Sequence, residues 1–98
     1  MCETGKATAV ATVQVDNEAV KVTEWRFAPG AETGWHRHEY DYVVVPITDG
    51  RLLLETPSGN VEAELRLGHS YSRPVGVEHN VINAGGGELA FIEVEIKR

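Results

Sequence analysis

Cysteine, long apolar runs and basic residues are all scarce in this sequence. The single cysteine, Cys2, cannot form an intramolecular disulfide, which excludes a disulfide-stapled secreted scaffold and predicts a frayed surface thiol. No apolar run approaches the roughly 20 residues that a membrane-spanning helix needs, and no charged-then-apolar signal stretch is present. We therefore expect a cytoplasmic protein without a membrane partner.

Acidic residues outnumber basic ones, fifteen to nine, which gives a formal net charge of −6. They are scattered along the chain rather than gathered in a tail, as expected of a solubilising surface. A negative net charge argues against nucleic acid or an anionic membrane as the partner.

Ninety-eight residues are enough for one domain. Residues 1–8 are small and polar and predict a weakly ordered N-terminal segment, which leaves residues 9–98 for the folded domain. A chain of this length buries only about 60–65% of the surface that its unfolded form exposes. The core therefore has little margin, and self-association is a common remedy.

A convincing helical stripe is missing from every window longer than about ten residues. Instead, short runs of β-branched and aromatic residues, many alternating with period two, lie between turn signals. The expected strands are residues 9–15, 20–27, 36–38, 40–48, 51–56, 61–67, 70–73, 79–83 and 89–96. Such a series of short strands predicts an all-β sandwich or barrel.

The expected strand 40–48 is apolar on both faces. A strand of this kind is covered on both sides, by the core and by a second layer or subunit. Pro46 predicts a local irregularity within it. Asp49-Gly50 predicts a hairpin turn, from which residues 51–56 return.

The last expected strand alternates between acidic and apolar residues. Glu93 and Glu95 share one face, opposite Ile92, Val94 and Ile96. We interpret the acidic face as the solvated one.

The histidines carry the clearest chemical signal. His36 and His38 are two residues apart, so in a strand both imidazoles project to the same face. His79, in a later segment with its own turn signals, is the candidate third ligand. Neutral imidazoles are common metal ligands, and three protein ligands with an open position mark catalytic sites. The alternative is that these are ordinary polar side chains in turns, and His69, beside Gly68, is expected at the surface.

The residues around these histidines resemble the two sequence motifs of the cupin family. The first motif reads Gly, five residues, His, any residue, His, three or four residues, Glu, six residues, Gly. Its glycines and histidines fall on Gly30, His36, His38 and Gly50. The second reads Gly, five residues, Pro, any residue, Gly, two residues, His, three residues, Asn. It falls on Gly68, Pro74, Gly76, His79 and Asn83. The whole chain, with its run WRFAPG…TGWHRHEYDYVVVP, is also similar to short bacterial cupins named for β-alanine degradation.

This resemblance implies a single jelly-roll barrel of two sheets, with a metal in the barrel mouth and a homodimer as the expected assembly. One divalent transition metal would bind to His36, His38 and His79, and Fe, Zn, Ni, Mn and Cu are all open. The motif's glutamate falls on Val43, which cannot coordinate a metal, and Asp41 is the candidate extra ligand. Three neutral imidazoles leave the charge of the metal uncompensated, which favours water or an anionic, chelating substrate in the open positions.

Three-histidine iron centres in the cupin superfamily belong to thiol and diketone dioxygenases. The resemblance therefore implies a small-molecule metalloenzyme of dioxygenase type that acts on an anionic metabolite. The alternatives are a non-catalytic module, whose metal captures a small ligand or is structural, and a metal-free β-barrel. Guanidinium groups match a substrate carboxylate, and tyrosine hydroxyls can donate to a substrate. The candidate substrate-binding residues are Arg26, Trp35, Tyr40, Tyr42, Tyr71 and Arg73.

Overall fold

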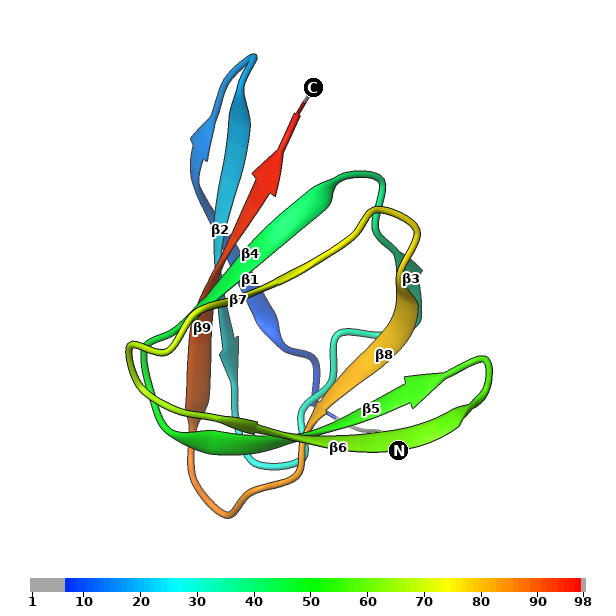
Figure 1. Cartoon of the computed structure of the whole chain (residues 1–98). Coiled ribbons are helices and arrows are strands. Elements are labelled where there is room, and N and C mark those ends of the chain that lie inside the picture. Colours follow the sequence, from blue (N-terminus) through cyan, green and yellow to red (C-terminus); the bar gives the residue numbers. More distant parts are fainter. Residues whose placement is uncertain (1–6, 98) are drawn as a thin grey trace.

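The computed structural model describes residues 7–97, and every helix or strand in that range is a β-strand. The strands are β1 (Val10–Asp16), β2 (Val20–Phe27), β3 (His36–Arg37), β4 (Asp41–Pro46), β5 (Gly50–Thr56), β6 (Gly59–Leu65), β7 (Tyr71–Arg73), β8 (Glu78–Asn83) and β9 (Leu89–Ile96). They form two antiparallel sheets that face each other, in the orders β1-β2-β9-β4-β7 and β3-β8-β5-β6 (Figure 1). The all-β jelly roll predicted from the sequence is confirmed.

The expected N-terminal segment and Cys2 fall largely outside the described residues. At residue 7 the chain is already held, because the carbonyl of Ala7 accepts a 3.0 Å hydrogen bond from the amide of Glu32. The amide of Ala9 donates back to the carbonyl of Glu32 at 2.9 Å. Within residues 7–97, no helix is long and apolar enough to cross a membrane.

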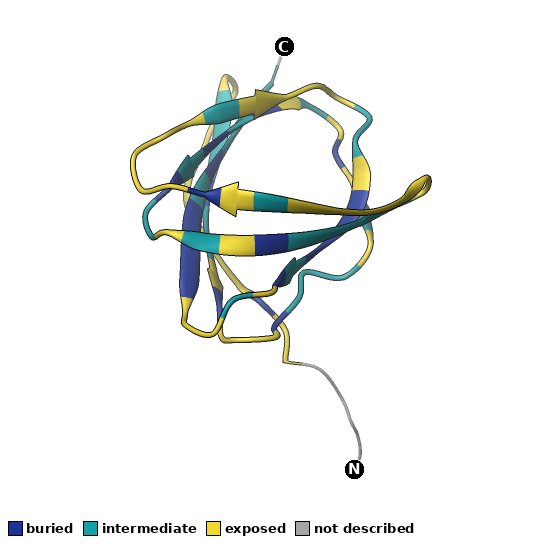
Figure 2. Cartoon of the chain, turned by 60° about the horizontal axis from the view of Figure 1, so that its bottom comes forward, coloured by how far each residue is buried: buried dark blue, intermediate teal, exposed yellow. Residues whose placement is uncertain are grey.

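The core lies between the two sheets. Its largest fully buried side chains include Phe27, Leu52, Leu65 and Leu89, which come from four different strands. In Figure 2, buried stretches alternate with partly exposed ones along the strands that enclose this core. Each such side chain, moved from water into the core, stabilises the fold by roughly 1.5–3 kcal/mol. The period-two pattern thus gives each strand an inward apolar face, and burial of these faces holds the two sheets together.

The face assignment of the last strand, β9, is the reverse of our interpretation from the sequence. Phe91 and Glu93 point into the barrel and are 4% and 8% exposed, whereas Ile92 and Val94 point outward and are only partly buried. β9 is the middle strand of its sheet, paired with β2 from Leu89 to Ile96 and with β4 from Phe91 to Ile96. Alternation shows which residues share a face, but it does not say which face the second sheet covers. The expectation that Glu93 lies on a solvated face is therefore wrong.

The predicted hairpin at Asp49-Gly50 is also wrong. β4 ends at Pro46 and pairs with β7 and β9, whereas β5 begins at Gly50 and pairs with β6 and β8 in the other sheet. The chain therefore crosses between sheets where a turn was expected. Gly50 has a packing role instead: a Cβ atom there would force the buried side chain of Leu89 to shift.

Candidate metal centre

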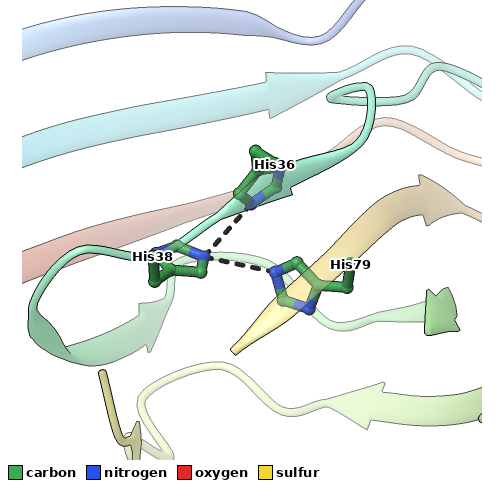
Figure 3. Close-up of side chains that lie close together, drawn as sticks. All are labelled: His36, His38 and His79. Carbon is green, nitrogen blue, oxygen red and sulfur yellow. Dashed lines mark hydrogen bonds between the residues drawn. The ribbon is translucent and has the colours of Figure 1, made fainter. Parts of the chain in front are cut away.

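Two neighbouring segments bring the three predicted histidines together at the barrel mouth (Figure 3). His36 on β3 lies directly opposite His79 on β8 in the antiparallel register, and His38 follows just after β3 ends. The Nε2 atom of His38 lies 3.1 Å from Nε2 of His36 and 3.2 Å from Nε2 of His79. Residues that are 41 positions apart in the chain thus present the same ring atom to one point.

A hydrogen-bonded loop fixes the orientation of His36. Its Nδ1 atom lies 2.9 Å from the carbonyl oxygen of Gly34. A carbonyl only accepts, so Nδ1 carries the hydrogen and Nε2 keeps its lone pair toward the other histidines. The amide of Gly34 in turn donates to Oδ1 of buried Asn80 at 2.9 Å. Asn80 therefore positions the first ligand through the backbone, a role that no motif position signalled.

Burial keeps the other two imidazoles neutral. His38 is 5% exposed and its ring stacks on Tyr42, with 3.8 Å between ring centroids. Burial, with the neighbouring His36 and His79, lowers the pKa of His38 to about 3. Burial, together with His36 and Arg73, lowers the pKa of His79 to about 4. Neutral imidazole is the form that binds metals, so both side chains are ready to act as ligands at neutral pH.

Hydrogen bonds alone do not satisfy these three rings. Nε2 of His38 is close to two other Nε2 atoms, but a ring nitrogen carries either one hydrogen or one lone pair. At least one of the two short contacts is therefore left without a hydrogen bond. A cation that accepts three lone pairs removes the conflict.

The spacing of the nitrogens also fits a metal. With metal–nitrogen bonds of about 2.1 Å, two ligands lie about 3.0 Å apart at a right angle and about 3.4 Å apart at a tetrahedral angle. The separations of 3.1 and 3.2 Å fall between these values. The ligand atoms of all three histidines lie within 4.8 Å of one another.

The structure does not bring Val43 or Asp41 to the histidines. Val43 faces outward and pairs with Val94, while the preceding residue, Tyr42, takes the inward position against His38. Asp41 is exposed, and its Oδ1 atom accepts a 2.8 Å hydrogen bond from the amide of Val75. Asp41 does share a face with Val43, as the sequence suggested, but that face is the outer one.

A carboxylate reaches the site from β9 instead. Oε2 of Glu93 lies 4.0 Å from Nε2 of His38, and because that imidazole is neutral the contact is not an ion pair. Burial, and then the negative charge of Glu95, raises the pKa of Glu93 to about 7. Sequence reasoning missed this residue because no motif covers it. The available signal was an acidic residue in line with the inward-facing Phe91.

Two cavities adjoin the histidines and differ in size. The cavity inside the barrel, beside His79, measures about 20 Å³, which is about the space of one water molecule. On the other side, His36, His38, Glu93 and Glu95 line a cavity of about 270 Å³. A small ligand therefore has room on this second side, which we call the β9-side cavity.

The remaining predicted residues divide between the site and the surface. Tyr71 and Arg73 line the small interior cavity, with the guanidinium of Arg73 4.8 Å from the centre of the Tyr71 ring. Arg26 is exposed and held by Glu24 and Glu88, each at 3.1 Å, so it is not brought to the histidines.

Trp35 and Tyr40 lie outside both cavities. Trp35 is 52% exposed, and its indole nitrogen donates to Glu78 at 2.9 Å. Tyr40 is half-buried and precedes β4. His69 is exposed, as expected, and takes no part in the three-histidine group.

Comparison with known proteins agrees with this geometry. The family model described as "Cupin domain" matches residues 23–95. The chain is 67% identical over 93 residues to "Beta-alanine degradation protein BauB" of Pseudomonas aeruginosa, covering 95% of this chain and 98% of that protein.

Solved structures give the same result. A cupin domain from Bordetella pertussis Tohama I is 62% identical, with a TM-score of 0.95 over 98% of this chain and 100% of that one. A double-stranded β-helix protein from Klebsiella pneumoniae shares the fold at 20% identity, with a TM-score of 0.78 over 97% of this chain and 82% of that one. The chain belongs to the cupin family.

Proposed function

We propose that this protein binds one divalent transition metal through His36, His38 and His79 and uses it to turn over a small anionic metabolite. The observation that carries the proposal is the convergence of three Nε2 atoms, two of them on buried imidazoles held neutral. When bound, the metal supplies a Lewis acid and, if it is iron, the capacity to activate dioxygen.

The protein's own residues perform the positioning. Gly34 and Asn80 fix the ring of His36, and stacking on Tyr42 fixes the ring of His38. The β9-side cavity, about 270 Å³, admits a small molecule and lies on the side where Glu93 adjoins His38. Three neutral ligands leave the charge of the metal for an anionic substrate to balance.

The reaction class that we propose is dioxygenation, in which both atoms of dioxygen enter the substrate. Its support is the three-histidine ligand set, which resembles that of thiol and diketone dioxygenases among cupins. The Pseudomonas aeruginosa relative is named for β-alanine degradation. We therefore propose that the metabolite is a short carboxylate of the kind that such a degradation handles.

Oxygen consumption by the iron-loaded protein tests this function. The panel should contain small thiols, diketones and β-amino-acid derivatives, with His79→Ala as the control that lacks one ligand. We expect dioxygen uptake that depends on one panel member and is lost in the variant. Iron bound at one per chain without uptake for any member would contradict dioxygenation and favour a non-catalytic binding module.

We also propose that the protein is a homodimer through the outer face of the five-stranded sheet. Val22, Val94 and Val43 are neighbours there on β2, β9 and β4, and all three are only partly buried. A second copy would supply the outer layer that the two apolar faces of β4 call for. The same apolar strip on both copies is self-complementary about a two-fold axis.

A further inference from the structure

We infer that Glu93 and Glu95 form the binding site for a primary ammonium group, so that the ligand of the β9-side cavity is a small amino acid. Its carboxylate end would face the metal, and to that extent the inference rests on the proposed function. Neither glutamate belongs to a motif of the sequence, and both lie on the inward face of β9.

The two carboxylates lie close together, and neither forms an ion pair within 4.0 Å with a lysine or arginine of the described chain, although Lys21 and Arg37 also line the cavity. One oxygen of each carboxylate and a ring nitrogen of His38 lie within 4.8 Å of one another. Glu93 is only 8% exposed and lies 4.0 Å from the neutral imidazole of His38. Trp25 and Lys21 act to lower its pKa, but burial and the charge of Glu95 outweigh them. A buried carboxylate whose charge is only partly compensated is costly, and a further cation beside it reduces that cost.

The neighbouring donors Lys21 and Trp25 do not fill the space beside the two glutamates. Lys21 lies opposite Glu95 in the β2–β9 register, yet no ion pair within 4.0 Å joins it to a carboxylate of the described chain. The indole nitrogen of Trp25 is buried in the same cavity, near enough to Glu93 to lower its pKa, although burial and Glu95 together raise it. That nitrogen has no hydrogen-bond partner among residues 7–97. The cavity thus holds two carboxylates whose charge its walls only partly offset, beside a buried indole donor without a hydrogen bond.

An ammonium group fits these acceptors better than a second metal ion. A second metal would need Nε2 of His38, but that atom already points at His36 and His79 and can serve only one cation. Without it, the pair offers two carboxylates alone. An ammonium group carries three donors and makes charge-assisted bonds to both.

The same geometry limits the length of the ligand. Glu93 is 4.0 Å from His38, so an ammonium group beside the glutamate and a carboxylate beside the histidines must be only a few bonds apart. The cavity of about 270 Å³ likewise suits a short chain. The ligand class is therefore a small amino acid, with a carboxylate and an ammonium group at opposite ends.

Calorimetric titration of the zinc-loaded protein tests the inference without any catalytic readout. The probes are 3-aminopropanoate, 3-hydroxypropanoate and propanoate, which share the carboxylate and differ at the other end. We expect 3-aminopropanoate to bind at least about tenfold more tightly than propanoate, because charge-assisted hydrogen bonds add to the shared contacts. Glu93→Gln and Glu95→Gln should each reduce this preference severalfold while propanoate binds as before. The matched control is Glu62→Gln, an exposed residue on β6, which should change nothing.

The possible failures are distinguishable. Zinc bound at one per chain with equal affinity for 3-aminopropanoate and propanoate would overturn the ammonium site and leave the metal proposal standing. Failure of the wild-type protein to bind zinc would instead overturn the proposed function. Loss of zinc from Glu93→Gln would show that this glutamate is a metal ligand, and would overturn its assignment to the ammonium group.

Discussion

When the metal-free protein is acidified, its buried histidines and its buried glutamate change the free energy of unfolding in opposite directions. His38 and His79 have pKa values lowered to about 3 and about 4, against 6.5 for an unperturbed imidazole. The unfolded chain therefore takes up protons first as the pH falls below 6.5. The stability that depends on neutral imidazoles is fully present above that pH and is lost toward the lower values. As the pH falls from 7 to 5, each of these two histidines should lower the free energy of unfolding by about 2 kcal/mol.

Glu93 acts in the opposite direction. Its pKa is raised from 4.5 to about 7, so the folded protein takes up this proton before the unfolded chain does. The stability linked to protonated Glu93 is fully present below pH 4.5 and is lost as the pH rises through 7. As the pH falls from 7 to 5, Glu93 should raise the free energy of unfolding by about 2 kcal/mol, which offsets the loss from one of the histidines. Wild-type protein should thus lose about 2 kcal/mol over this range, and Glu93→Gln about 4 kcal/mol.

Urea unfolding in the presence of a chelator, followed by circular dichroism at several pH values, measures this difference. Glu62→Gln, on the exposed β6 strand, is the control and should follow the wild-type pH profile. The difference between profiles, rather than the stability at one pH, isolates the titration from the effect of burying an amide. Parallel profiles for wild type and Glu93→Gln would refute the reasoning that Glu93 is a buried, titrating neighbour of His38.

Three further outcomes follow from the site and the sheet. His79→Ala should abolish zinc binding in a titration, whereas His69→Ala, an exposed histidine, should leave it unchanged; equal effects would mean that the third ligand is misassigned. Asn80→Ala should weaken zinc binding by about tenfold or more at unchanged stoichiometry, because it releases the loop that orients a ligand; competition with a chromophoric chelator measures this. Val94→Lys should give a monomer by light scattering while the control Val61→Lys, already 52% exposed, stays dimeric, and an unchanged Val94→Lys dimer would rule out the outer face.

Most of the fold was predictable because period two and turn residues are local signals. All nine expected strands are present in the structure, with ends that differ by a few residues. Local signals do not show which strands pair with each other. Asp49-Gly50 looks like a hairpin turn, but nothing within a few residues says that the strands before and after it belong to different sheets.

The histidine group was predictable for the same kind of reason. Two histidines with one residue between them share a face, and the second motif supplies His79, which lies opposite His36. The rest of the site depends on which face of each strand points into the barrel. Counting positions placed the missing carboxylate at Val43, but the inward residue is Tyr42 and the nearest carboxylate is Glu93, 4.0 Å from His38. That pairing needs the register of β9 in the sheet, which the sequence does not contain.

Anomalous diffraction from crystals grown with one equivalent of zinc tests the central claim most directly. We expect one peak per chain, about 2.1 Å from Nε2 of His36, His38 and His79. A zinc-containing crystal with no peak between these atoms, or with its peak on other residues, would contradict the claim that the three histidines form the metal site.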